Sequence, residues 1–432
     1  MQIGPRPPPA RDDGMIFPVS FVPEAIVRLL LIWIFGLLAT GTALSGESQS
    51  LDTQAQSILG ADQGVYVEAA DGTVLLAQAA AEPVHPASVS KVPTTLALLR
   101  KLGPEYRFVT TFATSGRVSA GTLYGDLLVE GGGDPAFVDE DALLVADRLR
   151  ELGIARIAGE LRLRGRLTFD WQSDDDGARL RRALAGAISP GALAAVRAFE
   201  LESPTGPAPA SLQPQGIRFL TATHANRSAA AARPLIVHRS QPLLSLAKSL
   251  NDYSNNIFKP LADEAGGASA VETLARSAVP ESLRSEITLG DGAGTDPRNR
   301  LSPRAAVSLL RALDAQLGTT GHALFDILPV SGIDDGTLRH RLDESAEVGR
   351  VVGKTGTFGD YGASALVGAI STSDRGTVYF AILNHGVPVP EARRRQDLFV
   401  RALLAHLHSV PWNYQRDVRP AIARAEVAAP TG

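Results

Sequence analysis

Segments with alternating apolar residues lie at opposite ends of the 432-residue chain, and this placement constrains the fold more than any other feature. Near the N-terminus, GVYVEAADGTVLLAQ (residues 64–78) alternates on both sides of Asp71-Gly72, a dipeptide that favours a tight hairpin turn. Near the C-terminus the pattern recurs in EVGRVVGKTG (347–356), GASALVGAIS (362–371) and GTVYFAILN (376–384). Strands at both ends that flank helices predict one sheet built from both ends, with helices packed against it. The expected fold class is α+β, or mixed α/β.

Helical periodicity occurs between and after these strands. Apolar residues three and four positions apart run from Val89 to Leu102 and stop at Gly103, which predicts an amphipathic helix with a C-terminal glycine. Residues 177–198, 243–250 and 391–408 are also expected to be helical. Residues 108–169 instead have strand-like patterns broken by Gly and Asp, which predicts a β-rich insertion after the first helix.

The N-terminal region has the features of an export signal. Arg28 precedes the apolar run Leu29–Leu38, and the small residues of ATGTALSGES follow. This order predicts a secretory signal peptide cleaved between Ala43 and Gly46, and therefore an exported, periplasmic protein. An uncleaved membrane anchor is the alternative, although the apolar run is short for a bilayer.

Composition excludes several classes of function. The formal net charge of −4, with no local run of Lys or Arg, provides no field for holding nucleic acid. The chain contains no cysteine, which removes disulfides, thiolate nucleophiles and cysteine-bound zinc. The 8 histidines include no HExxH or other pair with metal-ligand spacing. We therefore expect no metal and no cofactor, and catalysis by an oxygen or nitrogen nucleophile.

Ser88 and Lys91 form an SxxK pair at the start of the helix predicted to end at Leu102. One helical turn places residues i and i+3 on the same face, so the lysine amine can reach the serine hydroxyl. A serine becomes a good nucleophile when a neighbouring base removes its proton, and a lysine serves as that base once burial or nearby charge lowers its pKa. Such pairs are common by chance, and the alternative is a helix-capping serine beside a solvated lysine.

Lys354, Thr355, Gly356 and Thr357 form a KTGT motif where a C-terminal strand begins. The lysine and the threonine hydroxyls can hold a carboxylate, and Gly356 lets a substrate backbone approach closely. The backbone N–H groups of Thr357 and Ser88 are candidates for stabilising an oxyanion. In isolation, the alternative is a strand-edge turn with an exposed lysine.

Ser254 and Asn256 follow the helical segment that contains KSLNDY. The hydroxyl is suited to relay a proton to a leaving amine, and the amide is suited to orient Lys91 or the substrate. On their own, both residues would equally serve as helix caps. Asp291 in GDGAG and Asp335 in DDGT are interpreted first as structural residues of glycine-rich loops.

The motifs occur in the order SxxK, SxN and KTG, which is the signature of serine β-lactamases and penicillin-binding proteins. PASVSK, YSNN and VGKTGT, with LVEGGGDP, GDGAGT and LPVSGIDDGTLRHRL, resemble the D-alanyl-D-alanine carboxypeptidase family of the penicillin-binding-protein-4 type over about residues 50–408. The separation of Ser88 and Ser254, 254 − 88 = 166 positions, leaves room for the insertion that distinguishes this family from compact β-lactamases. One departure is Asn255, where the family commonly has Asp.

The resemblance implies a β-lactamase- or transpeptidase-like sheet flanked by helices, in a catalytic domain formed by residues 46–105 and 240–410. Residues 106–239 would be an inserted accessory region that ends in the Pro-rich linker SPTGPAPASLQPQG and short strands. Residues 1–45 would be the leader and signal peptide, and 411–432 a peripheral C-terminal tail. The implied roles are acylation at Ser88, Lys91 as its base, Ser254 and Asn256 in the proton network, and Lys354, Thr355, Gly356 and Thr357 as substrate-binding residues.

The implied function is a serine-type D-Ala-D-Ala carboxypeptidase or endopeptidase that acts on peptidoglycan stem peptides and is acylated by β-lactam antibiotics. A β-lactamase or an esterase on the same fold is the alternative among enzymes, because the motifs define a mechanism and not a substrate. A non-catalytic envelope protein that binds peptidoglycan or a partner is the alternative outside enzymes. Peripheral membrane association is compatible with these features, and nucleic acid is not an expected partner.

Overall fold

A computed structural model of the protein describes residues 50–202, 216–220, 231–253, 257–359, 362–419 and 424–430, which belong to one compact unit, Ser50–Gly432. Strands from both ends of the chain form a five-stranded antiparallel sheet, the main sheet, in the order β15-β16-β17-β1-β2. Val65 lies opposite Ile382, so the N-terminal hairpin extends the C-terminal strands as predicted. The strands are β1 (Gly64–Ala69), β2 (Val74–Gln78), β15 (Val351–Phe358), β16 (Ala363–Ser371) and β17 (Thr377–Asn384).

Both faces of the main sheet are apolar, because successive residues of a strand point to opposite sides. In β16, Ala365 and Val367 pack into one core, whereas Leu366 and Ile370 pack into the other. A sheet that is buried on both faces needs helices on both sides.

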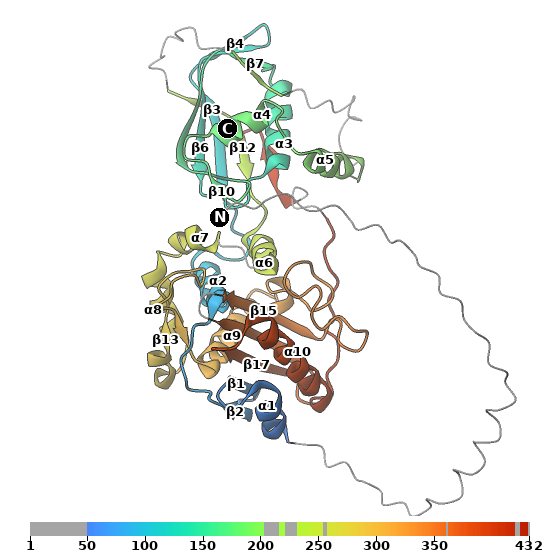
Figure 1. Ribbon diagram of the computed structural model, residues 1–432. Helices are drawn as coiled ribbons and strands as arrows, with labels where there is room; N and C mark the ends of the chain where they lie inside the picture. The colour runs from blue at the N-terminus through green and yellow to red at the C-terminus, as the bar shows by residue number, and fades with distance from the viewer. Residues whose placement is uncertain are drawn as a thin grey trace, which may run out of the picture. The chain divides into compact units, whose positions relative to one another are not determined.

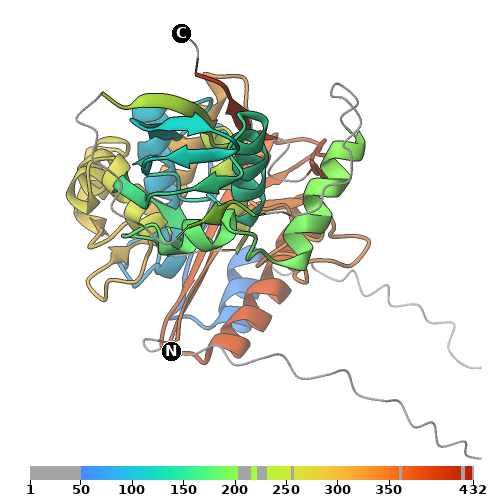
Figure 2. The same ribbon diagram turned by 90° about the horizontal axis from the view of Figure 1, so that it is seen from above.

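Helices supply that cover. On one face, α1 (Leu51–Leu59) and α10 (Val389–His406) lie side by side, and Arg395 donates a hydrogen bond to the carbonyl of Leu59 over 3.2 Å (Figure 2). The core on the other face includes residues of α2 (Lys91–Leu102), α6 (Leu243–Tyr253), α7 (Phe258–Glu264), α8 (Ala268–Ser277) and α9 (Pro303–Gly318) (Figure 1). The expected mixed α/β class, with helices flanking a sheet, is confirmed.

Residues between α2 and α6, together with β18 from the C-terminal segment, form separate sheets (Figure 1). These sheets surround a core of their own, which includes Phe112 and Phe137. One sheet has the order β18-β12-β3-β6-β8 and the other β11-β7-β5-β4. Their strands are β3 (Val109–Thr114), β4 (Arg117–Ser119), β5 (Thr122–Tyr124), β6 (Leu127–Gly132), β7 (Arg156–Ile157), β8 (Leu161–Arg166), β11 (Arg218–Phe219), β12 (Arg233–Arg239) and β18 (Glu426–Ala428). Two small pairs complete the described strands, β9 (Thr168–Phe169) with β10 (Gln172–Ser173) and β13 (Ile287–Thr288) with β14 (Arg300–Leu301).

The structure differs from the sequence-based expectations in the insertion and in the tail, and it also contains α1, α7, α8 and α9, which were not predicted. The helix expected over 177–198 is two helices, α4 (Ala178–Leu184) and α5 (Pro190–Glu202), separated where Gly186 has φ +95°. The strand-like region also contains α3 (Asp139–Glu151), whose first turn is acidic. The tail after Trp412 is not peripheral, because β18 pairs with β12 and Val427 packs against the core of the insertion.

Candidate active site

Ser88 lies in a 3₁₀ turn, η1 (Ala87–Ser90), that leads directly into α2. The turn packs closely against β15: a Cβ atom added to Gly356 would lie 2.7 Å from the carbonyl oxygen of Pro86 and 3.1 Å from the Ser88 nitrogen. Gly356 was expected to admit a substrate backbone, and it is required here because the Ser88 backbone itself approaches the strand. Two of the three sequence motifs therefore meet at this point.

Lys91 is fully buried and its amine faces Ser88. Its Nζ lies 2.8 Å from Ser88 Oγ and 2.5 Å from the carbonyl oxygen of Ala293, and 5.8 Å from the centre of the Phe258 ring. Burial lowers the pKa of Lys91 to about 8, and the charge of Asp291 opposes part of this shift. The solvated-lysine alternative for this SxxK pair is therefore wrong, because the amine is desolvated and bonded to the serine.

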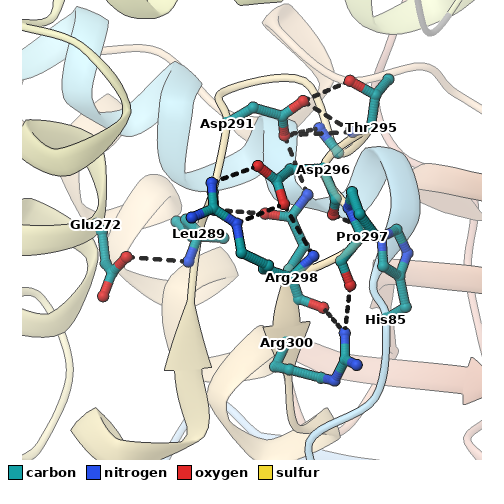
Figure 3. Close-up of polar contacts among 12 residues, drawn as sticks. His85, Glu272, Leu289, Asp291, Thr295, Asp296, Pro297, Arg298 and Arg300 are labelled. Atoms are coloured by element: carbon teal, nitrogen blue, oxygen red, sulfur yellow. Dashed lines mark hydrogen bonds and ion pairs between the residues drawn. The ribbon is translucent and has the colours of Figure 1, made fainter.

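The loop that carries Ala293 is organised by Asp291. Its carboxylate accepts hydrogen bonds from the Gly294 N–H over 2.8 Å, from Asn299 Nδ2 over 3.0 Å and from Thr295 Oγ1 over 2.5 Å (Figure 3). Burial raises the pKa of Asp291, but these hydrogen bonds outweigh it and the net shift is downward. Asp291 thus has the expected structural role, and the loop that it holds presents a carbonyl to Lys91.

The same loop is joined to the Ser88 turn through His85. The ring Nδ1 accepts the Ala87 N–H over 3.2 Å. Nε2 lies 3.0 Å from the carbonyl oxygen of Asp296, beside which Figure 3 draws it. The ring also stacks on Phe358 at the end of β15, with centroids 4.4 Å apart. This histidine therefore links the turn, the loop and the strand that surround Ser88.

Lys354 is buried within β15, and its Nζ donates to the carbonyl of Thr355 over 3.0 Å. Burial lowers the pKa of Lys354 well below its usual value, and the charge of Lys91 lowers it further. The exposed lysine of the alternative interpretation is not found. Thr355 Oγ1 lies 2.8 Å from Thr337 Oγ1, so the loop around residue 337 borders this strand.

Thr357 is exposed, and its hydroxyl accepts a hydrogen bond from Arg393 Nη2 over 2.7 Å. Arg393 belongs to α10, and sequence reasoning did not single it out. Its neighbours Arg341 and Arg394 are paired with Asp397 and Glu391, whereas Arg393 has no carboxylate within 4.0 Å among the described residues. A cavity of about 440 Å³ opens here, and its lining includes Thr337, Thr355, Arg341, Arg393 and Arg394. A guanidinium without a direct ion pair among the described residues therefore stands beside the KTGT hydroxyls, although the charge of Asp397 acts on it from farther away.

The predicted Ser254 and Asn256, with Asn255, lie outside the described residues. The helix before them, α6, ends at Tyr253, and the carbonyl of Asp252 accepts the Thr337 N–H over 2.8 Å. Burial raises the pKa of the Asp252 carboxyl to about 7, while Lys248 and Lys354 oppose the shift. The end of α6 is thus connected to the loop beside β15.

The fold and the site define a class of enzyme in which a serine and a buried lysine, one turn apart at the start of a helix, face a lysine-bearing strand at the edge of an antiparallel sheet. Comparison with known families makes the assignment specific. The chain belongs to the D-Ala-D-Ala carboxypeptidase 3 (S13) family, whose model matches residues 47–178 and 181–405. It is therefore a serine-type peptidase of the D-Ala-D-Ala carboxypeptidase kind.

Individual relatives agree with this family. The carboxypeptidase DacB of Mycolicibacterium smegmatis is 29% identical, over 89% of this chain and 86% of its own. The predatory endopeptidase Bd3459 of Bdellovibrio bacteriovorus, solved as a penicillin G-acylated form with immunity protein Bd3460, superposes with a TM-score of 0.70 at 22% identity, over 84% of this chain and 99% of its own. Penicillin-binding protein 4 of Haemophilus influenzae gives a TM-score of 0.58 at 19% identity, over 83% and 99%. The solved structures are similar in fold.

Proposed function

We propose that the protein cleaves D-Ala-D-Ala-containing stem peptides of peptidoglycan, as a carboxypeptidase, an endopeptidase or both, through an acyl-enzyme on Ser88. The observation that carries this proposal is the 2.8 Å contact between Ser88 Oγ and the buried amine of Lys91. The site does not distinguish the two activities, because the chemistry is shared and only the leaving group differs. Penicillins would acylate the same hydroxyl.

In the proposed reaction, Lys91 acts as the neutral amine. With a pKa of about 8, roughly a tenth of the molecules have it unprotonated at pH 7. The neutral amine accepts the Ser88 proton as Oγ attacks the carbonyl carbon of the penultimate D-Ala, and an oxyanion forms. The N–H groups of Ser88 and Thr357 would stabilise that oxyanion. The proton passes to the leaving amine, in the proposed network with Ser254 and Asn256, and water then hydrolyses the ester.

The free carboxylate of the substrate would bind along the strand from Lys354 to Thr357. Thr355 and Thr357 present hydroxyls there, and Arg393 adds a guanidinium that is already bonded to Thr357. Burial lowers the pKa of Lys354. A bound anion beside Lys354 would raise this pKa again, because it favours the protonated amine. We therefore propose that Arg393 binds the substrate carboxylate in addition to the residues of the KTGT motif.

Covalent labelling tests the proposal. Wild-type protein incubated with penicillin should gain one adduct on Ser88, and Ser88→Ala should lose both the adduct and peptide hydrolysis. Ser90→Ala is the matched control, because Ser90 is buried two positions away and its Oγ has no hydrogen-bond partner in the described part of the chain. Mapping of the adduct to Ser90 or Ser254 would refute the assignment.

Turnover separates the peptidase from the β-lactamase alternative. A peptidase should remain acylated by penicillin while it hydrolyses a D-Ala-D-Ala pentapeptide or a cross-linked muropeptide, and mass spectrometry identifies which bond is cut. Rapid release of penicilloate without peptide cleavage would favour a β-lactamase. Absence of any adduct would favour the non-catalytic binding protein.

We also propose export to the periplasm after cleavage near Ala43, with residues 46–105 and 240–410 as the catalytic domain and 106–239 as the insertion. The signal sequence falls outside the described residues. No helix in the described ranges is long and apolar enough to cross a membrane. Sequencing of the N-terminus of the protein recovered from the periplasm would test this proposal.

A further inference from the structure

The insertion contains a cavity of about 690 Å³ whose wall is rich in arginine. The cavity is bordered by α3, α4, β7 and β11, and the first three of these are labelled in Figure 1. We refer to it as the arginine cavity. Its arginines are Arg150 on α3, Arg156 on β7, Arg181 and Arg182 on α4, and Arg218 on β11.

These arginines are not neutralised within the described residues. None of the five has a carboxylate within 4.0 Å, although other arginines of the described chain, such as Arg276 and Arg304, are paired with Glu272 and Glu286. Asp147 on α3 is close enough for the charge of Arg150 to lower its pKa, but burial raises that pKa more. The flanking segments 203–215 and 221–230 contain no Asp or Glu. Guanidinium groups remain charged at every physiological pH, so the cavity is strongly positive.

The strand register brings two of these charges together. β11 pairs with β7 in parallel, and Arg218 is the direct partner of Arg156. Like charges placed opposite each other destabilise a sheet. The pair is formed by strands of only two residues each, which provide little other stabilisation to offset the repulsion. A bound anion between the two side chains would turn this repulsion into attraction.

Only some of the five arginines of the arginine cavity make side-chain contacts with other described residues. Arg150 donates to the carbonyl of Gly216 over 3.1 Å, Arg156 donates to Thr122 Oγ1 over 2.9 Å, and Arg181 stacks over the Phe219 ring at 4.7 Å. Arg182 and Arg218 are exposed, and their side chains make no hydrogen bond or ion pair with any described residue. Two guanidinium groups are thus available to a ligand, and three more are held in place around it.

We propose that the arginine cavity is a second binding site of this protein, for an anionic ligand that carries phosphate groups. A single carboxylate is satisfied by one bidentate arginine, whereas a phosphate presents several acceptor oxygens and up to about two negative charges to several guanidiniums at once. The convergence of five arginines therefore fits phosphate better than an isolated carboxylate. The phosphate can be presented by an anionic lipid headgroup or by a soluble phosphate ester. The site would attach the insertion to such a ligand independently of the chemistry at Ser88.

Binding measurements with the full chain test the proposal. The probes are vesicles of phosphatidylcholine with and without phosphatidylglycerol, soluble inositol hexakisphosphate, and polyglutamate as a carboxylate polymer. Arg182→Gln/Arg218→Gln removes two charges and no contact within the described protein. Arg284→Gln/Arg375→Gln is the control, because it makes the same change in net charge at exposed positions outside the cavity. The N-terminal segment is the same in every variant, so its contribution to vesicle binding cancels.

Because two basic residues are removed, the cavity variant should bind phosphate probes roughly 10- to 30-fold more weakly, and the control should differ little from wild type. Binding to phosphatidylglycerol vesicles alone would identify a headgroup as the source, and binding to inositol hexakisphosphate alone a soluble ester. Three results would overturn the proposal: no binding to either phosphate probe, equal or tighter binding to polyglutamate, or equal loss in the control. Unchanged melting temperature and unchanged penicillin labelling would show that the variants are folded, and Arg156→Gln/Arg181→Gln replaces the first pair if it does not fold.

Discussion

A buried lysine amine beside a serine hydroxyl favours its neutral form, and Lys91 is in this position. Burial places its pKa at about 8, so kcat/KM should rise with pH up to about that value and level off above it. Lys91→Arg should be nearly inactive at every pH, because a guanidinium stays protonated and cannot accept the serine proton. The measurement is a pH profile of penicillin acylation.

Asp252 provides the control for this assignment. It lies near the site and titrates in a similar range, because burial raises its pKa to about 7. Asp252→Asn removes that titration. If Lys91 is responsible for the pH dependence, kcat/KM should still fall as the pH drops below about 8, which is the acidic limb of the profile. A limb that disappears in Asp252→Asn, or substantial activity in Lys91→Arg, would contradict the role of Lys91 as base.

Arg393 should contribute through the carboxylate of the substrate. A hydrogen bond to a charged group contributes about 1.5–3 kcal/mol, so Arg393→Ala should lower kcat/KM for a free-acid peptide by roughly ten- to a hundredfold. A substrate amidated at its C-terminus lacks the charge and should lose much less. Arg394→Ala is the matched control, because Arg394 lines the same cavity but is paired with Glu391. Equal losses for the two substrates, or for the two variants, would show that Arg393 does not recognise the carboxylate.

At the level of elements, the turn η1 is held between β15 and the loop that contains Ala293, and glycines permit both contacts. A Cβ atom on Gly294 would lie 2.0 Å from the carbonyl oxygen of Ala87, and this glycine has φ +85°. Gly294→Ala should therefore combine backbone strain of about 1–2 kcal/mol with steric overlap that costs about 1–3 kcal/mol more, and it should slow acylation of Ser88. Urea unfolding and penicillin labelling measure the two effects.

Gly321→Ala is the control that measures backbone strain without steric overlap. Gly321 has a similar φ of +77°, but an added Cβ atom would meet nothing within 4 Å. The control should lose only the strain component and should acylate normally. If both variants were destabilised equally, the close approach of this loop to η1 would not matter for stability.

The sequence predicts the elements that local pattern determines. Alternation located the main-sheet strands, and the spacing of Ser88 and Lys91 predicted their contact because i and i+3 share a helix face. Five helices were not predicted, namely α1, α3, α7, α8 and α9. Two of them have clear signals: α9 follows Ser302, whose hydroxyl accepts the Ala305 N–H, and has Pro303 in its first turn, and α3 begins with three acidic residues.

Other parts of the site depend on long-range contacts that no local pattern contains. Ala293 faces Lys91 across 202 positions, and Arg393 reaches Thr357 across 36. A backbone carbonyl has no sequence signature, and Arg393 is one of three consecutive arginines that only packing distinguishes. The role of Gly356 in admitting the Ser88 turn likewise depends on how η1 meets the strand.

For the whole molecule, the C-terminal segment connects two cores. Trp412 and Tyr414 pack against the core on the α2 side of the main sheet, and the Tyr414 hydroxyl donates to Asp334 over 2.7 Å. Further along, β18 forms the edge strand beside β12 in the sheet of the insertion, with Val427 opposite His238. The C-terminal segment thus packs against the catalytic elements and also against the insertion.

A chain that ends at Arg419 would lose β18 and keep Trp412 and Tyr414. Each lost backbone hydrogen bond contributes about 0.5–1.5 kcal/mol, and Val427 leaves the core as well, so the insertion should lose roughly 2–4 kcal/mol of stability. Amide exchange measured by mass spectrometry should become faster in β12. Exchange in β15 and β16 and the rate of acylation by penicillin should stay unchanged, because neither the main sheet nor η1 contacts the removed strand in the described structure.

A chain that ends at Ala428 keeps β18 and should behave as the full chain does. Unchanged exchange in β12 of the shorter chain would contradict the pairing of β18 with β12, and slower acylation would show that the insertion supports the Ser88 site.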